Sequence, residues 1–127
     1  MVKMLLAVAA GGAVGAVGRY LVVSAVGHIF GTGFPLGTIV VNVVGSFVLG
    51  ALIEALALVW SPSPELRAMV VVGVLGGFTT FSIFSMDVVL LYERGALGQA
   101  ALYIGASVIL SIGAFFLGLS LLRSALA

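Results

Sequence analysis

The ten residues GGFTTFSIFS, from Gly76 to Ser85, interrupt an apolar stretch that is otherwise rich in valine. Two glycines followed by hydroxyl-bearing and β-branched residues make this a weak helical segment. If the stretch crosses a membrane, local unwinding frees backbone carbonyls that only a cation or a lined cavity can satisfy. The segment therefore predicts a helix that is broken at mid-membrane and holds an ion. The alternative is close packing of helices through small residues, which is the commoner use of glycine in membranes.

The composition around this segment is that of an all-α integral membrane protein. Of the 127 residues, 63% are hydrophobic and only 7% are charged, whereas about a quarter of the residues in a soluble domain are charged. A helix that crosses a hydrocarbon core needs roughly 20 apolar residues. Long stretches with almost no charge predict four transmembrane helices at about 4–26, 36–60, 64–92 and 96–123, in a single membrane domain, 1–127. The first of these does not read as a removable signal peptide.

Short turn signals separate the expected helices. Gly27 to Pro35 contains three glycines and a proline, which suits a turn before a helix that begins near Leu36. The run Ser63-Pro64-Glu65 offers a capping hydroxyl, a proline for the first helical turn and an acid for the positive helix end. The segment Tyr92 to Gly95 is very short. Adjacent helices must therefore be antiparallel, with both termini on one side of the membrane.

The basic residues are almost balanced between the two sides. Lys3, Arg67 and Arg123 belong to the side of the termini, whereas Arg94 and Arg19 belong to the other. Because an excess of Lys and Arg sets the orientation of a membrane protein, this near balance indicates weak orientation. It is what a dual-topology protein, inserted in both directions, would show. A chance balance in a small chain with few loops is the alternative.

Several functional classes are excluded or disfavoured by what the chain contains. It has no cysteine and a single histidine, so thiolate metal sites and histidine clusters are excluded. Its net charge of +1, with scattered basic residues, gives no footprint for nucleic acid. Glu54, Asp87 and Glu93 are expected near helix ends as solvated charges, so no proton relay is indicated. We expect no catalytic residue and no enzyme activity.

Asn42, the only asparagine, lies well inside the second expected helix. Thr38 precedes it by four residues and Ser46 follows it by four, so all three share one helical face. A buried amide in a membrane serves either an interhelical hydrogen bond or the lining of a pore. The residue alone leaves both interpretations open.

A stripe of hydroxyl groups marks the fourth expected helix, formed by Tyr103, Ser107 and Ser111 at spacings of four. Hydroxyls donate hydrogen bonds without carrying charge, so the stripe is a plausible track for a small anion that must not be trapped. The alternative is that the serines bond back to the preceding turn of their own helix.

The first expected helix carries one charge and several glycines. A charge at the centre of a membrane helix is costly, so Arg19 is expected beside an aqueous vestibule. The glycines form a small-residue face for tight packing, most simply against another copy of the protein; they are Gly11, Gly12, Gly15 and Gly18. A second copy would also add wall to any pore.

Three motifs together resemble the Fluc or CrcB family of fluoride channels. They are Gly12-x-x-Gly15-x-x-x-Arg19-Tyr20, Pro35-Leu36-Gly37-Thr38-x4-Asn42-x2-Gly45, and the opening segment from Gly76 to Ser85. The likeness spans the whole chain, and the number and length of the helices also agree. It implies an antiparallel homodimer in the membrane lipid, with two fluoride pores, a structural sodium ion at the centre and rejection of chloride.

The resemblance also assigns roles by position. It implies that Phe81 and Phe84 turn their ring edges toward fluoride, that Asn42 is the pore amide, and that the backbone carbonyls of Gly76 and Thr79 bind sodium. An aromatic ring has a positive edge, so it can replace water around an anion without adding a formal charge. The function implied is passive export of fluoride across a bacterial inner membrane, which lowers fluoride toxicity.

Two other functions compete with this interpretation. A small dual-topology multidrug transporter also has four helices and balanced charge, but it should carry an essential carboxylate deep in the membrane, and the first helix has none. A non-transporting assembly subunit would use Asn42 and the hydroxyl stripe only for hydrogen bonds between helices.

Overall fold

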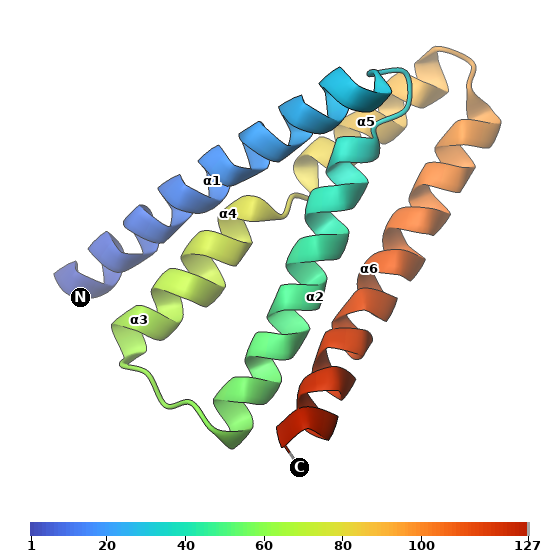
Figure 1. The fold of residues 1–127 in the computed structure, drawn as a ribbon. Coiled ribbons are helices and arrows are strands. Elements are labelled where there is room, and N and C mark those ends of the chain that lie inside the picture. The colour runs from blue at the N-terminus through green and yellow to red at the C-terminus, as the bar shows by residue number, and fades with distance from the viewer. Residues whose placement is uncertain (127) are drawn as a thin grey trace.

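The protein is entirely helical over the part of the chain that the structure, a computed structural model, describes, residues 1–126. In chain order the elements are α1 (Val2–Phe30), α2 (Leu36–Leu58), α3 (Pro64–Ala68), the π-helix η1 (Met69–Leu75), α4 (Gly76–Phe78), α5 (Ser82–Glu93) and α6 (Leu97–Leu126). The α1–α2 and α5–α6 loops lie at one end of the molecule, and both termini and the α2–α3 loop lie toward the other (Figure 1).

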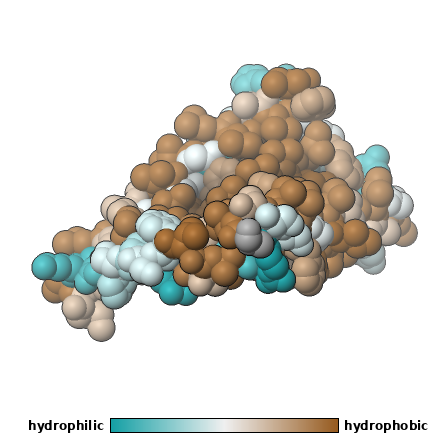
Figure 2. Space-filling view, turned by 60° about the horizontal axis from the view of Figure 1, so that its bottom comes forward, coloured by the Kyte–Doolittle hydropathy of each residue, from teal (hydrophilic) through white to brown (hydrophobic). Residues whose placement is uncertain are grey.

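Four segments are long and apolar enough to cross a membrane, which confirms the four predicted spans. They are α1, α2, α6 and the continuous run Pro64–Glu93, which contains α3, η1, α4 and α5 and is called the third span below. Hydrophobic residues cover most of the face seen in Figure 2, and hydrophilic residues are confined to small patches. Such a surface suits a lipid solvent rather than water.

The helix ends follow local signals, with one clear difference from the expected boundaries. Ser63 caps α3 as predicted, because its Oγ accepts a hydrogen bond from the Leu66 N–H at 3.2 Å. However, α1 continues through Gly27 and stops only at Phe30. The stop is set by Gly31, whose φ of 82° lies in the left-handed region that glycine adopts without steric cost.

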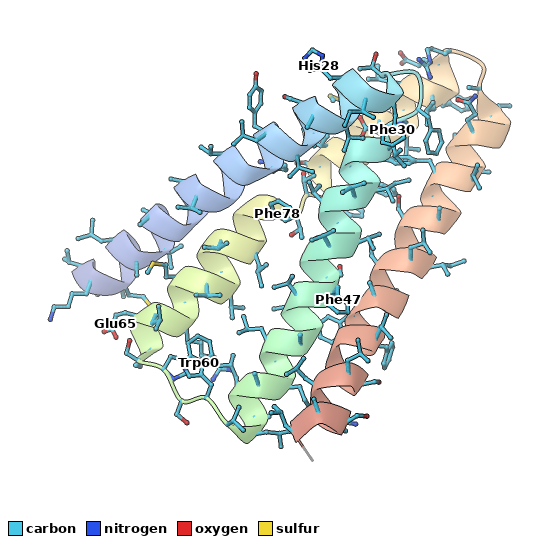
Figure 3. All side chains as sticks on the ribbon, viewed as in Figure 1. His28, Phe30, Phe47, Trp60, Glu65 and Phe78 are labelled. Atoms are coloured by element: carbon cyan, nitrogen blue, oxygen red, sulfur yellow. The ribbon has the colours of Figure 1, made fainter. Side chains whose placement is uncertain are left out.

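The third span departs from regular α-helical geometry in two segments. The turns from Met69 to Leu75 are π-helical, and α4 then ends at Phe78. Thr79 is extended, with φ −86° and ψ 160°, and α5 starts only at Ser82. Phe78 fills the space between α1 and α2, where its ring carbons lie close to Gly18 and Gly45 (Figure 3).

Two of the four glycines that were expected to pack against another copy, Gly11 and Gly15, pack instead against the third span of the same chain. Gly11 and Gly15 are buried, and a Cβ added to either would overlap a backbone carbonyl, that of Met69 or that of Val74. A Cβ added to Gly73 would in turn lie 2.8 Å from the Gly11 Cα. These residues form a seam in which two backbones touch, because no side chain separates them. The expectation was wrong because a small-residue face indicates close packing but not the identity of the partner.

A second pair of glycines joins α2 to α6. A Cβ on Gly50 would overlap the Phe115 carbonyl oxygen, and a Cβ on Gly118 would overlap the Phe47 carbonyl oxygen. Figure 3 shows Phe47 on α2 beside α6. The two helices are therefore in close backbone contact near the end of the molecule that carries the C-terminus.

Two arginines, one at each end of the molecule, bind groups from other segments of the chain. At the end with the α1–α2 loop, Arg94 Nη2 donates to the Gly33 carbonyl at 2.7 Å. At the other end, Arg123 binds Glu54 through two hydrogen bonds, of 3.0 and 3.1 Å. Glu54 is only 6% exposed, so the expectation of a solvated charge was wrong for this residue. Arg123 satisfies its carboxylate from the neighbouring helix.

Candidate functional site

A cavity of about 340 Å³ opens between α2, the third span and α6. Its wall contains every predicted pore and sodium residue except Tyr103, namely Asn42, Gly76, Thr79, Phe81, Phe84, Ser107 and Ser111. Gly45 makes room at one side, because a side chain there would overlap the Thr79 methyl group. The tertiary structure thus gathers groups from three separate spans around one space.

Asn42 binds the non-helical residues of the third span with both ends of its amide. Its Oδ1 accepts from the Thr80 N–H at 2.7 Å, and its Nδ2 donates to the Thr80 carbonyl at 3.0 Å. The interhelical interpretation is therefore realised. Because Nδ2 carries two N–H groups, the amide also has a further donor on the wall of the cavity. Both interpretations considered for Asn42 are compatible with this geometry.

The diversion of the Thr80 amide leaves a carbonyl without its helical donor. In a continuous helix the Thr80 N–H would bond to the Gly76 carbonyl, and the Ile83 N–H would bond to that of Thr79. Instead they donate to Asn42 Oδ1 and to Thr80 Oγ1, the latter at 3.2 Å. The carbonyls of Gly76 and Thr79 are thus among those next to the non-helical residues that lack their usual helical donors. Hard cations are bound by oxygen ligands of this kind, so the two groups fit a sodium ion.

Among residues 1–126, no group of three or more His, Asp or Glu residues lies close enough to hold a metal ion. Around the non-helical part of the third span, the available oxygens belong to backbone carbonyls and to the uncharged side chains of Asn42, Thr79 and Thr80.

Ser107 and Ser111 present hydroxyl groups that nothing in the described chain satisfies. Both Oγ atoms are buried and have no hydrogen-bond partner among residues 1–126. Bonding back to the preceding turn of α6, the alternative considered from the sequence, is therefore wrong for these two serines. Unpaired buried hydroxyls are costly, so their presence on a cavity wall points to a polar occupant.

The two phenylalanines of the predicted pore lie together but differ in exposure. Their ring centroids are 5.5 Å apart with an interplanar angle of 42°. Phe84 is 8% exposed and belongs to the hydrophobic core, whereas Phe81 is 78% exposed. One ring is therefore held by this chain, and the other projects from it.

Tyr103 is placed differently from the other two members of the hydroxyl stripe. Its side chain is fully buried, and its hydroxyl donates to Asp87 Oδ2 at 2.9 Å. Thr38 donates to the same carboxylate oxygen at 2.9 Å. The Tyr103 ring packs on Phe84, with centroids 5.1 Å apart. Tyr103 thus lies behind the cavity wall, where it contacts Phe84 rather than the open space.

Asp87 belongs to the surroundings of the candidate site although the sequence placed it among the solvated charges near helix ends. It is half-buried and accepts hydrogen bonds from α2 and α6. A usable signal was present: Asp87 follows Phe84 by three residues in α5 and therefore shares its helical face. Its partners, however, come from other helices and leave no trace in the local sequence.

Arg19 lines a separate cavity of about 350 Å³ between α1, α2 and the third span. Hydroxyl groups of Ser24, Thr38 and Thr80 share this wall. Arg19 Nε is buried and has no hydrogen-bond partner among residues 1–126. Thr80 lines both cavities, so both border the non-helical part of the third span. Arg19 and the main cavity therefore share Thr80 as a neighbour.

Comparison with known proteins shows strong similarity over nearly the whole chain. Residues 6–119 match the family described as "CrcB-like protein, Camphor Resistance (CrcB)". A protein of Rhodospirillum centenum named "Fluoride-specific ion channel FluC" is 60% identical over 125 residues, which cover 98% of this chain and 99% of that protein. Proteins with the same name from Chelativorans sp. and Cereibacter sphaeroides are 55% and 47% identical, over 96% and 100% of this chain and 98% and 100% of theirs.

These matches confirm the resemblance drawn from the three sequence motifs. They agree with the four apolar spans, which together with relatives named as ion channels indicate a multi-pass membrane protein. Members of the second and third motifs line the main cavity, whereas Arg19 and Tyr20 of the first motif line the neighbouring one. The chain therefore belongs to the CrcB-like family of membrane proteins.

Proposed function

We propose that this protein is a passive, fluoride-selective channel of the bacterial inner membrane that lets fluoride leave the cytoplasm. The observation that carries the proposal is the pair of unpartnered buried hydroxyls, Ser107 and Ser111, on the wall that also holds Phe81 and Phe84. Relatives that are 47% to 60% identical bear the name of fluoride-specific channels, which supports the choice of ion.

The chemistry of the cavity suits a small, strongly hydrated anion. Fluoride must exchange water for other donors as it moves, and the wall offers serine hydroxyls, the second Asn42 N–H and the positive edges of aromatic rings. Neither Arg nor Lys lines this cavity in the described chain, so no basic side chain on its wall would trap the anion. Arg19 lines the neighbouring cavity, where it raises the local positive potential as a vestibule residue.

The proposed assembly is an antiparallel homodimer with dual topology. Phe81 is 78% exposed although it lies on the cavity wall, and a second copy would cover it and close the open side. The near balance of basic residues between the two ends is compatible with insertion in both directions. The dimer would carry two pores, one for each chain's set of wall residues.

We further propose that the non-helical residues 79–81 form a break at mid-membrane depth and that sodium is a structural cofactor there. The carbonyls of Gly76 and Thr79, whose helical donors are bound elsewhere, would hold the ion. When bound, sodium supplies positive charge that neutralises freed backbone oxygens at bilayer depth. Asn42 keeps the segment unwound by occupying both backbone groups of Thr80.

The multidrug transporter remains the alternative function because the structure places two carboxylates within the spans. Glu54 is paired with Arg123, but Asp87 is bound only by hydroxyl groups in the described chain. A carboxylate inside a membrane span is the kind of group that a proton-coupled transporter uses. Transport measurements separate this function from passive fluoride conduction.

The test is ion efflux from proteoliposomes that contain the purified protein. Rapid fluoride release without chloride release is expected, and it should need no proton gradient. Proton-coupled movement of a cationic drug or dye without fluoride release would overturn the proposal in favour of the transporter. Absence of any transport would favour the assembly subunit.

The role of the two rings is tested by Phe81→Ile and Phe84→Ile. Each variant should slow fluoride release by tenfold or more while the dimer still assembles, because isoleucine has no polarised ring edge. The matched control is Phe116→Ile, at a 62% exposed phenylalanine of α6 that does not line the cavity. Equal release from all three variants would remove the proposed role of the ring edges.

A further inference from the structure

Four aromatic rings form a continuous row from the cavity to the loop that joins α1 to α2. Phe81 contacts Phe84, and Phe84 contacts Tyr103, with centroid distances of 5.5 and 5.1 Å. Tyr103 in turn contacts Phe34, at 5.6 Å and an interplanar angle of 85°. The last contact has the edge-to-face geometry that aromatic pairs prefer. Phe34 is not one of the described residues that line the cavity.

The position of Phe34 is held from outside the row. The α1–α2 loop that carries Phe34 is bound to the α5–α6 loop by the hydrogen bond from Arg94 Nη2 to the Gly33 carbonyl, which is 2.7 Å long. Phe34 packs against the buried cluster that contains Phe84 and Tyr103. The Arg94–Gly33 bond therefore sets the position of the loop residue that precedes Phe34.

Tyr103 lies between Phe34 and Phe84, the ring that lines the cavity. Its side chain is fully buried, so the ring has little freedom as long as its neighbours stay in place. The hydroxyl is fixed on Asp87, and one side of the ring contacts Phe84. Removal of the Phe34 ring would leave space beside Tyr103, into which the Tyr103 and Phe84 rings could turn.

We propose that Phe34 is a positioning residue of the pore, which acts through Tyr103 on the orientation of Phe84. The inference rests on the proposed function, because it assigns Phe84 to the fluoride path. It adds a loop residue outside the cavity to the set that determines conduction. It also makes the Arg94–Gly33 bond the outer support of that set.

The test is a double-mutant cycle on reconstituted protein, with Phe34→Leu, Tyr103→Leu and the double variant. Phe34→Leu should slow fluoride release roughly two- to tenfold, the range expected for loss of one aromatic pair. In the Tyr103→Leu background the same change should have almost no further effect, because the transmitting ring is gone. Phe34→Tyr, which keeps the ring, should restore release to near that of the unchanged protein.

The matched control is Phe30→Leu, at a 69% exposed phenylalanine at the same end of the molecule (Figure 3). It should leave release unchanged. Dimer recovery on size-exclusion chromatography separates a folding defect from a conduction defect. Additive effects of Phe34→Leu and Tyr103→Leu, or unchanged release from Phe34→Leu, would overturn the inference. Failure of the unchanged protein to release fluoride would instead overturn the proposed function itself.

Discussion

The seam between α1 and the third span and the cavity between α2, the third span and α6 use the same segment in opposite ways. In the seam, Gly11 and Gly15 bring two backbones into contact, and no space is left for even one methyl group. In the cavity, Ser107 and Ser111 face about 340 Å³ of space and lack any partner in the described chain. One side of the third span is packed tightly and the other is left open.

This difference suggests a division between residues that build the fold and residues that we propose serve transport. A close backbone contact cannot adjust, so a change at the seam should lower stability. A hydroxyl without a partner has no hydrogen bond to lose, so its removal should not lower stability but should slow transport. The following predictions test this division, beginning with the largest effect.

The largest loss of stability is expected for Gly15→Ala. The added methyl would overlap the Val74 carbonyl oxygen, and both backbones would have to separate. Overpacking typically costs about 1 to 3 kcal/mol, and an overlap with backbone, which no side-chain rotation can relieve, should lie at or above the upper end of this range. The better helix propensity of alanine offsets only about 1 kcal/mol of this cost. The measurement is the thermal unfolding midpoint of the protein in detergent.

The matched control is Gly12→Ala on the same helix, where an added Cβ meets no atom within 4 Å. Its unfolding midpoint should be unchanged or slightly raised. If both variants unfold at the same temperature, the seam is not the rigid contact described here.

An intermediate effect is expected at Asn42, which lies between the two regions. Asn42→Ala removes both partners of Thr80 and leaves a backbone N–H and a carbonyl without hydrogen bonds. An unsatisfied group costs about 1 to 3 kcal/mol when it stays buried, but Thr80 borders both cavities, where water can replace the amide, so the total loss should be only about 1 kcal/mol. The unfolding midpoint should fall, together with fluoride release.

Ser46→Ala is the control for this prediction, because Ser46 lines the same cavity from the same helix. It should leave the midpoint unchanged. A midpoint for Asn42→Ala equal to that of the control would mean that the amide serves the pore alone and does not hold the non-helical segment.

The smallest effect on stability is expected for Ser107→Ala and Ser111→Ala. Because neither hydroxyl has a hydrogen bond to lose and each is an unsatisfied buried group, the free energy of unfolding should stay unchanged or rise slightly. Fluoride release should nevertheless slow about tenfold, since a hydrogen bond to a charged group is worth about 1.5 to 3 kcal/mol.

Ser120→Ala provides the comparison for both measurements, because Ser120 is an exposed serine of α6 away from the cavity. Release from the two cavity variants that matches release from Ser120→Ala would place the ion path elsewhere. A large loss of stability in either cavity variant would contradict the absence of a hydrogen-bond partner.

Local signals predicted most of the fold and a large part of the candidate site. Ser63 and Pro64 set the start of the third span because capping is decided within one helical turn. Ser107 and Ser111 were found by their spacing, which places them on one face of a helix. By contrast, Gly27 was taken as the end of the first helix, but the chain needs the positive φ of Gly31 to stop. Glycine content alone does not reveal which residue adopts that conformation.

The sequence by itself determined that the chain has four apolar spans, that their order forces antiparallel neighbours, and that the segment around Gly76 is a poor helix. Hydropathy and helix propensity are properties of short stretches, so they can be read without knowledge of the partners. The tertiary structure alone decided what each face meets: Gly15 meets the third span, Glu54 meets Arg123, and the hydroxyl of Tyr103 meets Asp87. Helical periodicity tells which residues share a face, but only the packing of the helices decides what lies opposite that face.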